Sequence, residues 1–349
     1  IIQPRVGIGL LEIRRSAYTK IFAGQGGTDS YVNAIFDIYQ DNFEEGIFTG
    51  KGIYNLEIFS KVLKNEIPEN TVLSHDLLEG CYLRCGMATD VMLMDGYPTN
   101  YLASKKRSHR WIRGDYQILG WLKNKKLNIL SKYKILDNIF RSDLEVSVVL
   151  CIVVLLLLKM FLNIKIWPVI VFLFISILMP YILEIANKII FKKEAETKQK
   201  TFIKNKTTIQ NSIIKAFFAV ATLPDKAYMS ISAAITSLYR MLISKKHLLE
   251  WVTAEEAEKS SKNDIKSYYS NMFANVVCGI LGLIIFPFIN VYGFIVLIFS
   301  ILWIITPAIM CYLSKPIEEK KPVNELNLND KEYILDIARK TWLFFKEFI

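Results

Sequence analysis

Residues 105–117 read KKRSHRWIRGDYQ, and the character of the chain changes soon after them. Ahead of this basic segment, residues 74–80 read SHDLLEG, and helix and strand signals alternate as they do in a soluble α/β domain. Behind it come long apolar segments with few charges, which are typical of membrane helices. We therefore expect an α/β domain over residues 1–143 joined to an α-helical transmembrane region.

The composition agrees with a membrane protein that has a basic cytoplasmic face. The chain has 349 residues, of which 52% are hydrophobic, and a formal net charge of +10. A net positive charge can favour binding to nucleic acid, to anionic lipid headgroups or to phosphorylated substrates. Lys and Arg also flank membrane helices on their cytoplasmic side. This last explanation accounts for most of the charge, and we expect no nucleic-acid partner.

The five cysteines give no sign of a metal site or of an oxidising compartment. Cys81 and Cys85 are four residues apart and share one face if their segment is helical. Two cysteines without a nearby His or a second Cys pair make a poor zinc site. We expect buried, reduced thiols.

Four segments are apolar enough to be membrane spans, arranged as two hairpins. At about 1.5 Å per residue, segments of this length cross a hydrocarbon core of about 30 Å. The hairpins occupy residues 144–187 and 272–313, with very short turns near residues 163–165 and 290. The expected spans are residues 146–163, 166–186, 272–289 and 291–313.

The connection between the hairpins, residues 188–271, is long and basic at its start. Positive loops stay on the cytoplasmic side, so the multi-pass chain is expected in the inner membrane with its amino-terminal domain in the cytoplasm. Apolar stretches at residues 213–218 and 231–243, separated by Leu223-Pro224-Asp225, are predicted to be interfacial helices. A further pair of spans is the competing interpretation, which Tyr239-Arg240 and the basic residues 245–247 make less favourable.

The first 143 residues resemble only the second half of an α/β domain. We expect helices at residues 30–43, 56–63, 75–84 and 108–122, a short strand at 90–94, and a Gly-punctuated extended segment at 46–54. Both ends of the chain look cut. We expect missing parts of the same protein on either side, and residues 314–349 would be a linker with the start of a following domain.

Asp76 is the candidate catalytic base. The transfer of a sugar from a nucleotide donor requires a base that takes the proton of the attacking acceptor hydroxyl. A carboxylate at a helix amino end is held ionised and oriented by free backbone N–H groups. The alternative is purely structural: Asp76 or Ser74 caps the helix, and Glu79 is the partner in a capping box.

The segment 105–117 supplies the candidate substrate-binding residues. Arg107, Arg110 and Arg113 suit a diphosphate, because guanidinium groups bind phosphate in a bidentate manner. Trp111 suits a sugar ring, whose C–H face packs on an aromatic surface. The alternatives are a basic juxtamembrane helix face for the arginines, and core packing or an interfacial anchor for Trp111.

Gly50 and Lys51 lie in the segment GIFTGKG at residues 46–52 and are also candidate binding residues. Glycine allows the backbone to approach a ligand closely. Taken alone, this pattern is more often an ordinary turn.

Together, GIFTGKG at 46–52, LSHDLLEG at 73–80 and RSHRWIRGD at 107–115 resemble the processive glycosyltransferases of the cellulose synthase type. Those enzymes carry a Gly-containing acceptor loop, a Thr-Glu-Asp base motif and a Gln-x-x-Arg-Trp motif. The longer sequence around these motifs most resembles that of the cyclic β-1,2-glucan synthases. LLEWVTA at 248–254 resembles its counterpart there, and IARKTW at 337–342 resembles the start of the glycoamylase-like domain that follows.

The resemblance implies a GT-A type domain that transfers glucose from UDP-glucose, with inversion, to a growing β-1,2-glucan acceptor at the membrane lipid surface. Asp76 falls on the base position, and Arg110 and Trp111 fall on the Arg-Trp pair. A divalent metal, Mg²⁺ or Mn²⁺, is implied with ligands mostly outside this chain, because the nucleotide-binding half and its Asp-x-Asp motif are absent. Asp29 and Asp41 do not replace that motif. Two positions depart from the family: Ser74-His75 precedes the base, and Arg107 stands in place of the Gln.

Three rival functions remain open. A related synthase could make another linkage, because nothing in the sequence specifies which hydroxyl attacks. A transporter without catalysis is compatible with four spans and a basic loop, although the spans offer no obvious acidic relay. A non-catalytic scaffold fragment is the third.

Overall fold

We analysed a computed structural model of the chain. It describes residues 1–23, 38–162, 165–190, 198–252, 256, 258, 262–289, 293–317 and 327–348. The chain forms two compact units, Ile1–Pro316 and Ile317–Ile349. The hairpin turns expected at 163–164 and 290, most of the helix expected at 30–43, Asp29, and Thr253-Ala254 lie outside the described residues.

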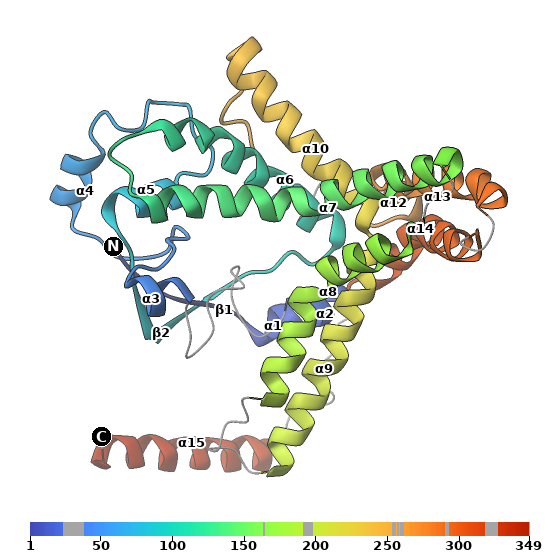
Figure 1. Cartoon of the computed structure of the whole chain (residues 1–349). Coiled ribbons are helices and arrows are strands. Elements are labelled where there is room, and N and C mark those ends of the chain that lie inside the picture. The colour runs from blue at the N-terminus through green and yellow to red at the C-terminus, as the bar shows by residue number, and fades with distance from the viewer. Residues whose placement is uncertain are drawn as a thin grey trace. The chain divides into compact units, whose positions relative to one another are not determined.

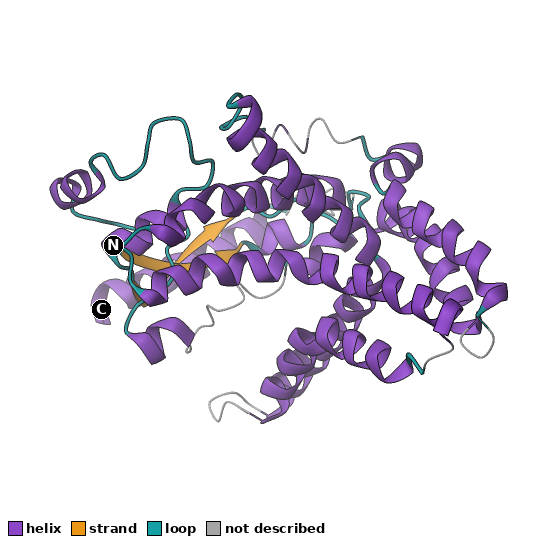
Figure 2. Cartoon of the chain, turned by 45° about the horizontal axis from the view of Figure 1, so that its top comes forward, coloured by secondary structure: helices purple, strands orange, loops and turns teal. Residues whose placement is uncertain are grey.

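The described part of the chain is mostly helical around one pair of strands (Figure 2). Strand β1 (Ile2–Ile8) pairs in parallel with β2 (Gly86–Asp95), and the register is interrupted between Pro4 and Arg5. The strand expected at 90–94 is confirmed within β2. Because the described sheet has only these two strands, the GT-A fold remains a prediction.

The helices in the first 83 residues are short, and two of them begin at side-chain caps. Asn55 caps α4 by accepting from the Ile58 N–H, and Ser16 forms a capping box with Thr19 at α2. The helix expected at 56–63 has those bounds, and the one expected at 75–84 is α5. The elements are α1 (Leu10–Ile13), α2 (Ala17–Phe22), α3 (Ile38–Phe43), α4 (Leu56–Leu63) and α5 (Asp76–Leu83).

Helix α6 (Tyr101–Gln117) carries the basic segment and begins where the Asn100 side chain accepts from the Ala103 N–H. It continues into the 3₁₀ helix η1 (Ile118–Lys123). Helix α7 (Ile129–Leu162) follows and runs without a break through residue 143. The boundary expected between the soluble domain and the first hairpin therefore lies inside a helix.

Within the part of the chain that the structure describes, two helices are long and apolar enough to cross a membrane: α8 (Trp167–Ile190), over Trp167–Ala186, and α14 (Gly293–Leu313). A third candidate is bent by 73° where α12 (Ile265–Asn271) meets α13 (Phe273–Ile285), which continues into the 3₁₀ helix η3 (Phe286–Phe288). The first expected span falls on the carboxyl-terminal half of α7, which is not among the candidates found within the described residues. Four spans therefore remain a prediction.

The two apolar stretches of the connection, at 213–218 and 231–243, are helical, and their interfacial position remains a prediction. Helix α9 (Lys198–Ala221) ends just before α10 (Leu223–Tyr239), so the break expected at Leu223-Pro224-Asp225 is confirmed. Helix α10 then widens into a π-helical turn, η2 (Arg240–Ser244). Helices α8 and α9 run side by side (Figure 1). The second unit contains α15 (Leu328–Phe348).

The buried cores join the amino-terminal helices of the first unit to its later, apolar helices. One core packs Tyr101 and Leu102 of α6 against Phe218 of α9 and Met310 of α14. Another packs α5 against α7 around Leu78 and Ile135, both fully buried. Helix α6 is therefore fixed on the membrane helices at one end and stands beside α5 at the other.

Candidate active site

The loop before α4 is held in place by the side chain of Gln3, which is buried on β1. Gln3 Nε2 donates to the Ile47 carbonyl at 3.0 Å, and its Oε1 accepts from the Thr49 N–H at 2.5 Å. The Gly46 N–H donates to the Cys85 carbonyl at 2.7 Å. These bonds fix the loop on both sides of the sheet and thereby determine where Gly50 lies.

Gly50 lies directly against the Asp76 carboxylate. Its φ of +84° is a left-handed conformation that favours glycine, and a Cβ at this position would lie 2.6 Å from Asp76 Oδ1. The loop and the amino end of α5 therefore meet only because residue 50 has no side chain.

A second close approach brings α5 to α6. A Cβ at Gly114 would lie 2.5 Å from the Ser74 Cβ. Gln117 of α6 also accepts from the Leu73 N–H through Oε1, at 2.7 Å. The two motifs that lie far apart in sequence, SHDLLEG and RSHRWIRGD, are thus in contact at their backbones.

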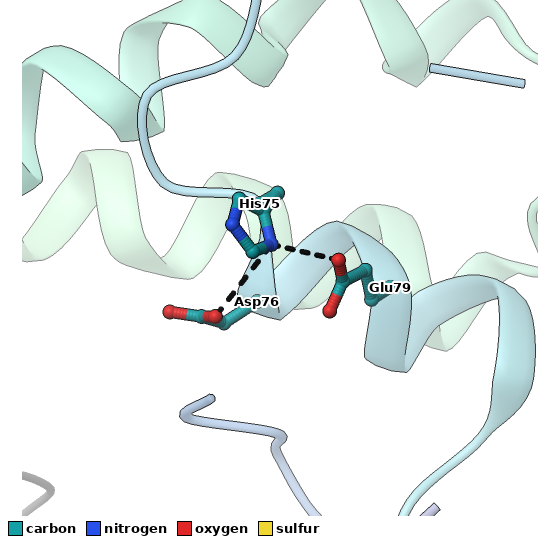
Figure 3. A group of neighbouring side chains, drawn as sticks. All are labelled: His75, Asp76 and Glu79. Atoms are coloured by element: carbon teal, nitrogen blue, oxygen red, sulfur yellow. Dashed lines mark ion pairs between the residues drawn. The ribbon is translucent and has the colours of Figure 1, made fainter. Parts of the chain in front are cut away.

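Asp76 is the first residue of α5 and lies among four charged groups. Two of them, His75 and Glu79, are drawn in Figure 3. Burial raises the pKa of the Asp76 carboxyl above its ordinary value, and nearby Glu79 acts in the same direction. The positive charges of His75, Arg110 and Lys51 oppose that shift. The result is a carboxylate that is more basic than usual and that still faces cations.

Lys51 forms an ion pair with Asp95, at the end of β2. Burial acts to raise the pKa of Asp95, but the bonds from Lys51 and the Gly96 N–H outweigh it and lower the pKa. Sequence reasoning missed Asp95. The sequence did contain a signal for Asp95: it is a carboxylate, followed by Gly, at the end of a predicted strand. Ligands bind at the carboxyl-terminal edge of parallel sheets.

Arg107 is stacked between two aromatic rings. Its guanidinium carbon lies 5.0 Å from the centroid of the Tyr97 ring and 4.8 Å from that of the Trp111 ring. Both contacts have cation–π geometry. Burial lowers the pKa of Arg107 from its very high ordinary value. One face of the Trp111 indole is therefore in contact with Arg107.

The other two arginines of α6 contact the segment 248–252. The Arg110 guanidinium carbon lies 4.8 Å from the Trp251 ring centroid. Arg113 is buried and donates to the Glu250 carbonyl at 3.0 Å and to the Leu248 carbonyl at 3.5 Å. Arg113 thus holds this segment against α6, and Trp251 is a second residue that sequence reasoning did not single out as part of the site.

A cavity of about 550 Å³ lies between α6, α10, α12, α13 and the segment 248–252. Glu250 is its only acidic lining residue among the described part of the chain. Its His109 is kept neutral, because burial and neighbouring cations lower the pKa to about 4. The cavity is strongly basic and suits an anion. Its cationic lining residues are Lys105, Lys106, Arg107, Arg110, Arg113 and Arg240.

A smaller cavity of about 320 Å³ lies among α2, α6, α8, α9, α10 and α14. Each of its three lysines has a carboxylate partner: Lys105 with Asp225, Lys215 with Glu184 and Lys226 with Glu145. Most of its other walls are rings and hydroxyl groups, including Tyr18, Tyr97, Tyr101 and Tyr181. Lys105 lines both cavities.

The described residues do not supply the divalent-metal site that the resemblance implies. His75, Asp76 and Glu79 are the one group whose potential ligand atoms gather, within 4.8 Å, in the part of the chain that the structure describes. His75 Nδ1 is already 2.7 Å from Glu79 Oε1, which raises the pKa of the imidazole and favours its protonated form. A protonated imidazole cannot ligate a metal. None of the three lines the basic cavity.

The structure thus divides the predicted site residues into two neighbouring groups. Asp76, Gly50 and Lys51 gather where the loop meets α5, whereas Arg107, Arg110 and Arg113 line the basic cavity. Arg110 joins the groups, because its charge acts on Asp76. Trp111 contacts Arg107 and is not among the residues that line the cavity.

Comparison with known proteins connects the chain to the glucan synthases. No protein-family model matches it. It is, however, 31% identical over an alignment of 355 positions to a curated protein of Rhizobium meliloti (strain 1021), and the alignment covers the entire chain. That relative is the cyclic beta-(1,2)-glucan synthase NdvB, and the chain spans 12% of its length. The resemblance deduced from the three motifs is confirmed.

Proposed function

We propose that the chain is the acceptor-side part of a glycosyltransferase that transfers glucose, with inversion, from UDP-glucose to a growing β-1,2-glucan. Relatedness to a glucan synthase supports sugar transfer. The single observation that carries the proposal is the Asp76 carboxylate, which lies against the Gly50 loop and faces Arg110.

In the proposed reaction, a hydroxyl oxygen of the glucan acceptor attacks the anomeric carbon of the donor glucose. The bond from that carbon to the diphosphate oxygen breaks, UDP leaves, and the hydroxyl proton passes to Asp76. A carboxylate whose pKa is raised by burial is a better proton acceptor than an ordinary aspartate, provided that it stays ionised. The nearby cations His75, Lys51 and Arg110 favour the ionised form.

The basic cavity is proposed to receive the leaving diphosphate. Arg107 and Arg110 are the best placed arginines, because Arg113 already donates to two backbone carbonyls. Fixed cations in a partly closed cavity stabilise charge that develops on a leaving group. A divalent metal could add Lewis acidity there if residues outside this chain hold it; no step proposed here depends on it.

Trp111 is proposed to support the acceptor sugar, and Gly50 with Lys51 to border it. The stack of Tyr97, Arg107 and Trp111 keeps the indole orientation fixed, and a fixed ring is what a packed pyranose requires. We also propose that the site faces the cytoplasm at the inner membrane, with lipid around α8 and α14.

Replacement of the base tests this function directly. In the full-length protein in membranes, Asp76→Asn should leave UDP-glucose binding within about twofold of the parent and reduce glucan synthesis by at least about a thousandfold, as expected when a general base is lost. Asp90→Asn, an exposed aspartate on β2, is the matched control and should retain full synthesis. Synthesis by Asp76→Asn at the parental rate would refute the assignment.

A further inference from the structure

His75 lies beside the proposed base and bridges two carboxylates (Figure 3). Its Nδ1 is 2.7 Å from Glu79 Oε1 and 3.7 Å from Asp76 Oδ1. Glu79 is nearly buried, with 13% of its side chain exposed, whereas 54% of the His75 side chain is exposed. His75 precedes α5 without capping it, so its imidazole is free to serve this bridge.

Four charged groups act on the Asp76 carboxylate, from three elements. His75 and Glu79 belong to α5 and its cap, Lys51 comes from the loop and Arg110 from α6. Lys51 is engaged by Asp95, and the Arg110 guanidinium is stacked on Trp251. His75 is therefore the cation that touches Asp76 most directly among the described residues.

We propose that the His75 imidazolium, anchored by Glu79, is a positioning residue that keeps the Asp76 carboxylate ionised and oriented for proton abstraction. The inference rests on the proposed role of Asp76 as the base. It assigns a role to the position at which this chain carries His where the cellulose synthase type carries Glu.

Removing the charge of His75 and removing the charge of Glu79 should shift the pKa of Asp76 in opposite directions. Removing the positive His75 leaves Glu79 as an uncompensated negative neighbour, so the pKa of Asp76 rises. Removing the negative charge of Glu79 lowers the pKa of Asp76. An unperturbed His titrates at about 6.5 and an Asp at about 3.9, and Glu79 raises the pKa of His75 further, so the positive form of His75 is favoured in the pH range where an aspartate titrates.

The experiment is the pH dependence of kcat/KM for glucan synthesis by the full-length protein. His75→Gln should move the acidic limb to higher pH by roughly half to one unit, because a unit charge about 4 Å from a partly exposed carboxylate has an effect of this order. Below that limb the rate should fall at least about threefold relative to the parent. Glu79→Gln should move the limb the opposite way, and the double variant should return it toward the parental position.

His247→Asn is the matched control. His247 is also an exposed imidazole beside a glutamate, Glu250, at 3.7 Å, but it does not act on Asp76. Its φ of +58° is tolerated by Asn, so this variant should keep the parental profile.

Each other result has a definite meaning. A loss of the same size at every pH, with an unmoved limb, would show a merely structural role and overturn the proposal. Complete loss at every pH in His75→Gln would make the histidine itself catalytic and would also overturn it. If Asp76→Asn stays active, the base assignment fails; if that variant is inactive and the limb of His75→Gln does not move, only the role of His75 fails.

Discussion

At the scale of single residues, the site depends on the absence of a side chain as much as on the presence of one. Gly50 allows the loop to reach the Asp76 carboxylate, and its left-handed φ excludes most other residues. Sequence analysis singled out Gly50 and Asp76 separately, because each sits in a local motif. Their contact could not be predicted, since it joins a loop to a helix through the placement set by Gln3.

Gly50→Ala should therefore damage the site more than the fold. A non-Gly residue in the left-handed region costs about 1–2 kcal/mol, and the added Cβ would displace the Asp76 carboxylate. We expect glucan synthesis to fall at least tenfold while the midpoint of thermal unfolding drops by only a few degrees. Gly120→Ala is the control, because a Cβ there meets nothing within 4 Å. Equal activity in the two variants would contradict the tight contact.

At the scale of elements, α6 packs against the helices that include the candidate span α14 and a part of the bent candidate, α12. The Asp225 carboxylate, fully buried at the start of α10, accepts from Tyr101 at 2.7 Å and from Lys105 at 2.5 Å. Asn275 of α13 completes the network by accepting from the Asp225 N–H at 2.9 Å. The helix break at Leu223-Pro224-Asp225 was predictable from its local sequence, whereas partners 120 and 50 residues away were not.

Asp225→Asn should loosen this junction. Removing one partner of a buried ion pair leaves Lys105 without its counter-charge, which typically costs about 3–5 kcal/mol. We expect a lower temperature of thermal unfolding for the purified protein in detergent. Asp336→Asn, which removes an exposed pair with Lys340 on α15, should change it very little. Similar unfolding temperatures for both variants would show that the buried pair is not a structural tie.

At the scale of the whole molecule, hydropathy predicted that the chain contains long apolar helices, but it did not predict how many of them have the length and composition of membrane spans. Helices α8 and α14 have the length and composition of spans, while α13 meets its neighbour at a sharp bend. The bend at Met272 leaves no mark in a hydropathy profile, because it arises where Met272 packs, fully buried, against α6, α9 and α14. The α/β class was predictable only in part, because the described sheet has two strands and most of the described residues are helical.

The proposed topology can be tested by cysteine labelling in membrane vesicles. In a cysteine-free background, Lys125→Cys and Lys262→Cys should react with an impermeant maleimide only in inverted vesicles, because both belong to the basic cytoplasmic face. Phe288→Cys, at the turn after α13, should react only in right-side-out vesicles. Labelling of all three positions from the same side would exclude the two-hairpin arrangement.

Lys105 borders both cavities, and this shared ammonium has a thermodynamic consequence. An anion in the larger cavity would attract it away from Asp225, and the smaller cavity would then contain a less well compensated carboxylate. If both cavities bind a ligand, the dissociation constant of each ligand would depend on the other, by a factor that is identical in both directions. A titration of one ligand at increasing concentrations of the other would measure that coupling.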